Sequence, residues 1–109
     1  MKDWDHLIEA LTTFRDERNW KQFHNAKDLA LALSIEAAEL NELFLWKTAT
    51  EANKEKIKEE LADVFAYALL LAKTYELDVK QIVLDKIKLN GEKYPIDKAK
   101  DSAKKYNEF

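Results

Sequence analysis

The sequence predicts an all-α fold, and three observations support this class. Glycine and proline, the residues that most often break helices, occur once each in 109 residues, as Gly91 and Pro95. Alanine, leucine, glutamate and lysine, which favour helices, are abundant. Apolar residues also recur at intervals of three and four along most of the chain. We therefore expect one domain over residues 1–109, a four-helix bundle with an irregular tail over about residues 92–109.

Two helices are expected in the first half of the chain. The first covers about residues 3–17, where apolar side chains fall on one face. The second runs from about Ala26 to Lys47, and Asn25 is its expected N-cap. Residues 29–35 are apolar nearly all round, which predicts that the second helix is central and buried.

Two more helices are expected in the second half. The segment from Thr48 to Glu51 has the form of a capping box, which opens or precedes a third helix over about residues 51–75. Asp78 is the expected cap of a fourth helix. That helix should end just before Gly91, because glycine commonly terminates helices.

The composition excludes several kinds of site and partner. Cysteine is absent, one glycine cannot form a phosphate-binding loop, and two histidines (His6 and His24) cannot form the usual histidine metal sites. The net charge of −3 lacks the basic character of a nucleic-acid binder. No apolar run approaches the roughly 18 residues that a membrane span needs. We expect a cytoplasmic protein that binds neither membranes nor nucleic acid, and whose chemistry uses carboxylates.

Two pairs of carboxylates lie where an apolar core is expected. Glu36 and Glu39 share one helix face, and no Lys or Arg lies within four positions of either. Glu60 and Asp63 repeat this arrangement, and twenty residues between Glu39 and Glu60 allow an antiparallel return. Like charges on a buried face are costly, so we expect the four carboxylates to converge on a cation. Oxygen ligands alone suit Mg²⁺ or Mn²⁺.

A simpler interpretation stays open at this point. Carboxylates at positions i and i+3 are common on solvated helix faces, and an acidic face could serve a non-enzymatic helical module that binds a basic partner. Glu42 and Glu59 are more ambiguous still. Each is either a ligand of a second metal, a support for the first site, or part of the solvated face.

The sequence resembles a known family at these positions. The pattern Glu36-x-x-Glu39, twenty residues, Glu60-x-x-Asp63 is similar to the ExxE…ExxD signature of the MazG-like all-α nucleoside triphosphate pyrophosphohydrolases. Further segments, spread over nearly the whole chain, resemble the dCTP pyrophosphatase branch. They are FRDERNWKQFH (14–24), ELNELFLWK (39–47), EELADVFAY (59–67), KIKLN (86–90), KYP (93–95) and SAKKY (102–106).

The resemblance implies an activity, a cofactor and an assembly. The activity is Mg²⁺-dependent cleavage of the α–β bond of dCTP or a related dNTP to monophosphate and pyrophosphate, which serves nucleotide-pool house-cleaning. The assembly is a homo-oligomer, either a dimer or a tetramer. The implied metal ligands and catalytic residues are Glu36, Glu39, Glu60 and Asp63. On mechanistic grounds, Glu39 is the candidate base that orients or deprotonates the attacking water.

The resemblance also implies which residues bind the substrate. The base pocket would have Trp20 and Trp46 as walls, with Phe23 and His24 nearby. Contacts to the phosphates or the sugar would come from Tyr67, Lys86, Asn90 and Tyr94. One departure concerns Leu11, because relatives in the animal dCTP branch carry a histidine there, near the nucleotide. The base preference is therefore open, and a dUTPase-like member of the same superfamily is the enzymatic alternative.

Overall fold

The computed structural model describes residues 2–108, and within that range every regular element is a helix. The predicted all-α class is therefore confirmed. The chain divides into two compact units, Met1–Leu77 and Asp78–Phe109. No helix among the described residues is long and apolar enough to cross a membrane. A single domain over 1–109 and the packing of four helices into one bundle both stay predictions.

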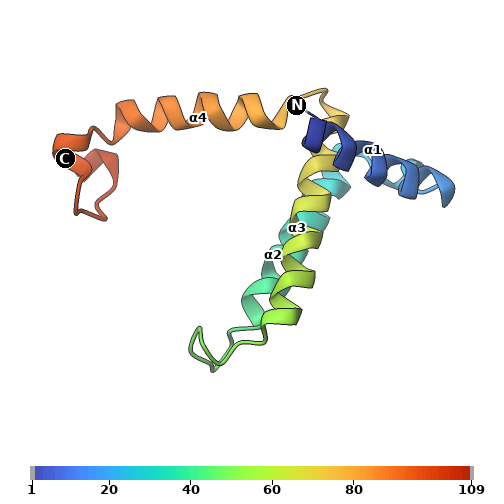
Figure 1. The fold of residues 1–109 in the computed structure, drawn as a ribbon, viewed down its shortest axis with the longest axis horizontal. Helices are drawn as coiled ribbons and strands as arrows, with labels where there is room; N and C mark the ends of the chain where they lie inside the picture. Colours follow the sequence, from blue (N-terminus) through green and yellow to red (C-terminus); the bar gives the residue numbers. More distant parts are fainter. Residues whose placement is uncertain (1, 109) are drawn as a thin grey trace. The chain divides into compact units, whose positions relative to one another are not determined.

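The first unit contains three long helices and a short 3₁₀ turn. These are α1 (Lys2–Glu17), the 3₁₀ turn η1 (Lys21–Phe23), α2 (Ala26–Glu42) and α3 (Lys54–Thr74). The helices α2 and α3 lie side by side and antiparallel, and α1 packs against α3 (Figure 1). The antiparallel return that the carboxylate spacing predicts is confirmed.

Asparagine side chains begin the two helices of this hairpin. Asn25 caps α2 as predicted, because its Oδ1 accepts the Asp28 backbone N–H at 2.9 Å. At α3 the cap is Asn53, and the predicted start near residue 51 is three residues too early. The Thr48 N–H does donate to a Glu51 carboxylate oxygen at 2.8 Å, but this bond closes a turn that precedes the helix.

The second helix is shorter than predicted. It ends at Glu42, although the sequence predicts helix to about Lys47. Residues 43–47 form successive turns, with Trp46 in the left-handed region at φ 61°. A non-glycine residue at positive φ interrupts the helical backbone, so the apolar residues after Glu42 belong to the connecting loop.

Two helices end in left-handed residues other than glycine. After α1, Asn19 has φ 55°, and the Trp20 N–H donates to the Arg15 carbonyl at 3.0 Å. After α3, Glu76 has φ 54°, and the Leu77 N–H donates to the Ala72 carbonyl at 2.9 Å. Both ends are Schellman motifs, which satisfy carbonyl groups left over at a helix C-terminus.

The second unit begins with a helix that continues through its glycine. Asp78 caps α4 (Val79–Lys93) as predicted, accepting the Gln81 N–H at 3.1 Å. The predicted stop at Gly91 is wrong, because Gly91 does not adopt a positive φ and the helix continues for two more residues. Pro95 follows the actual end of α4, and the residue before a proline is disfavoured in a helix.

The C-terminal segment is more ordered than predicted. Beyond α4 it contains a short helix α5 (Ile96–Ala99) and the 3₁₀ turn η2 (Tyr106–Glu108). The prediction of an irregular tail is therefore wrong in part, and the described residues form five α-helices where the sequence predicts four. Two residues favour the start of α5: Pro95 precedes the helix, and Asp97 lies in its first turn, where a negative charge is favourable.

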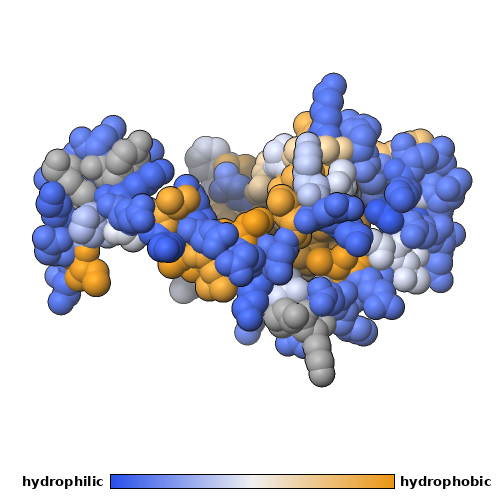
Figure 2. Space-filling model, turned by 90° about the horizontal axis from the view of Figure 1, so that it is seen from above, coloured by the Kyte–Doolittle hydropathy of each residue, from blue (hydrophilic) through white to orange (hydrophobic). Residues whose placement is uncertain are grey.

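The buried apolar core of the described residues is small. It consists of Leu29 on α2 with Leu69, Leu70 and Ala72 on α3, and Leu29 is the most deeply buried of them. The prediction that residues 29–35 are buried all round is wrong for the single chain, because Ile35 is 48% exposed. Hydrophobic side chains also reach the surface elsewhere, as the orange areas of Figure 2 show. One helix can present only part of its circumference to a single neighbouring helix, so the rest of an apolar helix stays uncovered.

Leu29 should contribute more to stability than any exposed leucine. We expect Leu29→Ala to lower the free energy of unfolding by about 2–5 kcal/mol, through lost burial and the cavity left behind. Leu45→Ala is the matched control, because Leu45 is 57% exposed whereas Leu29 is 1% exposed. Urea denaturation followed by circular dichroism measures both variants, and equal losses would contradict the assigned core.

Candidate metal centre and adjacent pocket

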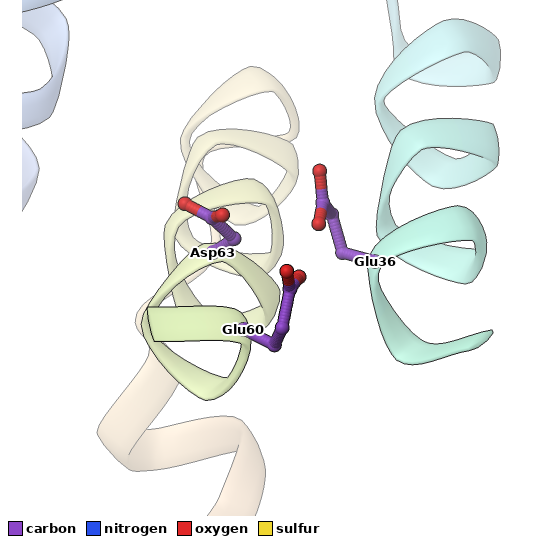
Figure 3. Close-up of side chains that lie close together, drawn as sticks. All are labelled: Glu36, Glu60 and Asp63. Atoms are coloured by element: carbon purple, nitrogen blue, oxygen red, sulfur yellow. The ribbon is translucent and has the colours of Figure 1, made fainter. Parts of the chain in front are cut away.

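Three of the four predicted carboxylates meet between α2 and α3. Glu36 projects from α2, while Glu60 and Asp63 project from α3, where their i, i+3 spacing places them on one face. One carboxylate oxygen from each residue lies within 4.8 Å of the others (Figure 3). The hairpin therefore brings together groups that are 24 to 27 residues apart in the sequence.

In the part of the chain that the structure describes, two carboxylate oxygens of the cluster lack the hydrogen-bond donors that would offset their burial. Glu36 Oε2 and Glu60 Oε2 are buried and have no hydrogen-bond partner among the described residues. Burial, together with the neighbouring carboxyl groups of Glu60, Glu39 and Asp63, raises the pKa of Glu36 to about 7. Buried oxygens without partners and mutually repelling carboxylates are the donor set that a hard divalent cation satisfies. The residues present thus fit Mg²⁺ or Mn²⁺.

The fourth predicted ligand, Glu39, lies at the edge of this cluster. Its side chain is exposed, and it is not among the three whose oxygens converge. It is nevertheless close enough to Glu36 to raise the pKa of that residue. Its role as ligand or base stays a prediction. Glu42 and Glu59 are exposed, and neither joins the three converging carboxylates.

A pocket of about 280 Å³ adjoins the carboxylates within the first unit. Asp63 belongs to both, so the two features are continuous. Three of the predicted substrate-binding residues, Trp20, His24 and Tyr67, line it. The complete lining is Leu11, Phe14, Arg15, Trp20, His24, Asp63, Ala66, Tyr67 and Leu70.

The polar groups in the pocket have a defined protonation at neutral pH. Burial, and then the nearby carboxylates of Glu36, Asp63 and Glu39, raise the pKa of Tyr67, so its hydroxyl stays protonated. Burial, and then the charge of Arg15, lower the pKa of His24, so its ring is neutral. His24 Nδ1 is buried with no partner among the described residues, and the ring lies edge-on to Tyr67 at 6.5 Å between centroids.

The structure leaves the other predicted substrate residues outside this pocket. Phe23 is 62% exposed in the turn after α1, and Trp46 is 92% exposed in the loop after α2. Lys86 and Asn90 lie in the second unit, where they line a shallow depression on α4. Tyr94 follows α4 and is half-buried. The contacts predicted for these residues stay predictions.

Sequence reasoning missed five lining residues as candidates for binding. Phe14, Arg15, Ala66 and Leu70 are not among the predicted site residues, and Leu11 was noted only as a departure. A signal for three of them was present, since Leu11, Phe14 and Arg15 follow the i, i+3, i+4 spacing of one helix face. Arg15 then stands out as a charge on an otherwise apolar stripe.

Comparison with known proteins settles the family. The sequence model of the MazG-like family matches residues 31–109, which is more than half of the chain. The chain belongs to the MazG-like family. The chain is 41% identical to mouse dCTP pyrophosphatase 1 and 40% identical to the human protein, in alignments that cover 88% of this chain. The chain spans 61% of the length of these two relatives.

A solved structure supports both the fold and the family. The crystal structure of a pyrophosphatase from Archaeoglobus fulgidus is 38% identical to this chain, with a TM-score of 0.78. The alignment covers 84% of this chain and 91% of the archaeal one. The all-α architecture with its α2–α3 hairpin is therefore that of the MazG-like family.

The raised pKa of Glu36 predicts how the metal-free protein responds to pH. Because the folded state holds this proton more tightly than the unfolded state, the contribution is stabilising below the ordinary pKa of 4.5 and is lost as pH rises through about 7. We expect the free energy of unfolding in EDTA to fall between pH 5 and pH 8.

Two substitutions separate this effect from general titration. Glu36→Gln should flatten the dependence on pH, while Glu59→Gln, an exposed position on α3, should leave it as in the wild type. Urea denaturation at a series of pH values measures all three proteins. An unchanged pH dependence in Glu36→Gln would show that this carboxyl is not the responsible group.

Proposed function

We propose that this chain is a Mg²⁺-dependent nucleoside triphosphate pyrophosphohydrolase that cleaves dNTPs to dNMP and pyrophosphate, with dCTP favoured. One observation carries the proposal: Asp63 belongs both to the carboxylate cluster and to the aromatic pocket. When a nucleoside triphosphate binds with its nucleoside in that pocket, the α-phosphate is the phosphate nearest to the carboxylates, because it is attached to the 5′ oxygen.

Relatives support the reaction and its substrate class. The mouse and human proteins that this chain resembles are dCTP pyrophosphatases, and the archaeal structure is that of a pyrophosphatase. The sequence has no glycine-rich loop that could bind the phosphates, because its sole glycine, Gly91, lies within a helix. Recognition of the triphosphate therefore depends on side chains and a cation.

Different residues of the chain would bind the cation, bind the nucleotide and accept the proton in such a reaction. Glu36, Glu60 and Asp63 would hold a cation, which when bound neutralises phosphate charge and lowers the pKa of a coordinated water. Trp20 stacks against the base, and the Tyr67 hydroxyl, protonated at neutral pH, donates to the sugar or a phosphate oxygen. Glu39, exposed at the edge of the cluster, would accept a proton from the attacking water.

The assembly that we propose is a homo-oligomer. The single chain leaves many large apolar side chains exposed, including Leu31 and Phe65 on the two helices of the hairpin. Trp46 is 92% exposed, whereas an aromatic wall of a base pocket is normally covered. A second copy of the chain that covers these residues would bring Trp46 to a pocket shared between subunits. Lys86, Asn90 and Tyr94 would then complete the phosphate and sugar contacts.

Product analysis in ¹⁸O-water tests the reaction. Attack of water on the α-phosphorus breaks its bond to the bridging oxygen, so we expect ¹⁸O in the monophosphate and unlabelled pyrophosphate as the leaving group. Mass spectrometry of the separated products measures both, with dCTP as the first substrate. Nucleoside diphosphate with orthophosphate as the main products would refute the proposal.

A matched pair of variants ties the activity to the cluster. Glu60→Gln removes one converging carboxylate and should abolish most turnover, while Glu59→Gln alters an exposed neighbour on α3 and should keep it. Equal activity in the two variants would assign the chemistry to other residues.

A further inference from the structure

The pocket beside the carboxylates contains a buried arginine. Arg15, in the last turn of α1, is 9% exposed and is the buried charged residue of the described chain. It lines the pocket of about 280 Å³ together with aromatic and aliphatic side chains. Removing a guanidinium from water is costly, and among the described residues Arg15 has one carboxylate partner, Asp16 at 2.9 Å. A guanidinium carries five N–H donors, so a further acceptor in the pocket can bind it.

One side-chain hydrogen bond holds the guanidinium of Arg15 and leaves most of its donors free. Its Nε donates to Asp16 Oδ1 at 2.9 Å, while the backbone carbonyl of Arg15 accepts the Arg18 N–H at 3.2 Å and the Trp20 N–H at 3.0 Å in the cap of α1. Within the described residues, the two Nη groups donate to no protein acceptor. The guanidinium is thus held along its Nε edge, and its Nη edge remains available to a ligand in the pocket that Arg15 lines.

The surroundings favour a nucleobase over a phosphate as that ligand. Leu11, Phe14 and Trp20 give the pocket an apolar and aromatic lining, which suits a flat ring. The phosphate oxygens would instead lie beside the carboxylate cluster, where a bound cation offsets their charge. The His24 ring is neutral at pH 7, so Arg15 is the permanent positive charge of the lining.

We propose that Arg15 donates two hydrogen bonds from its Nη groups to adjacent acceptors on the edge of a pyrimidine base, and so selects cytosine over uracil. This inference rests on the proposed function and assigns its base specificity to one residue. Cytosine presents O2 and N3 side by side as acceptors, which match the planar fork of a guanidinium. Uracil has the same shape, but its N3–H is a donor that faces the donors of Arg15.

Two substitutions at this position separate charge from geometry. Arg15→Lys keeps the charge but loses the fork, and Arg15→Met keeps much of the apolar stem but loses both. We expect the ratio of kcat/KM for dCTP to that for dUTP to fall roughly 10- to 100-fold in both variants, the discrimination typical of a bidentate base contact. Lys27→Gln, which removes an exposed charge on α2, is the control and should keep the wild-type ratio.

The alternative outcomes overturn the proposal in distinguishable ways. An equal loss for dCTP and dUTP would assign Arg15 to the triphosphate, and an unchanged ratio with lowered stability would make it a structural residue. If the wild type hydrolyses neither nucleotide, the proposed function fails, and ligand-detected NMR with deoxycytidine and deoxyuridine still tests Arg15. Preferential binding of deoxycytidine that both variants lose supports the contact, and equal binding of the two nucleosides contradicts it. Circular dichroism checks the fold of each variant, and Arg15→Lys carries the test if Arg15→Met unfolds.

Discussion

The central physical constraint in this protein is the repulsion among three carboxylates that the α2–α3 hairpin holds together. Glu36, Glu60 and Asp63 have oxygens within 4.8 Å of one another, and two of these residues contain a buried oxygen without a partner. A chain free of functional demands would replace such a cluster with apolar side chains, since buried like charges oppose folding. The small core of Leu29, Leu69, Leu70 and Ala72, formed by these same two helices, offsets that cost.

The pocket depends on the same hairpin and on the end of α1. Asn19 adopts a left-handed conformation, which closes the helix and bonds the Trp20 N–H to the Arg15 carbonyl. Trp20 and Arg15 thereby reach the pocket that Asp63 and Tyr67 line from α3. A helix cap, which is ordinarily a matter of local stability, here also places a stacking surface and a charge beside the carboxylates.

Local signals in the sequence predicted much of this structure, and non-local packing accounts for the rest. Asn25 and Asp78 cap helices as predicted, because capping depends on residues within one turn. Glu36, Glu60 and Asp63 were predictable because helical spacing and loop length fix their faces. Gly91 misled the prediction, because its φ is not positive and α4 continues through it to Lys93. The left-handed residues that follow α1 and α3 are Asn19 and Glu76, neither of them a glycine.

The residues that sequence reasoning missed or misplaced have a different origin. Arg15 is buried by packing between helices, which a one-dimensional pattern does not report. Trp46 was expected in the pocket, but α2 ends at Glu42 and Trp46 lies in the loop that follows, where it is 92% exposed in the single chain.

Binding of Mn²⁺ measured by electron paramagnetic resonance tests the central claim most directly, because free Mn²⁺ loses its signal when bound. We expect saturable binding by the wild type and by Glu59→Gln, and its loss in Glu60→Gln, since only Glu60 of these two residues is in the cluster. Equal binding by all three proteins would show that the cluster is an acidic surface and not a metal centre.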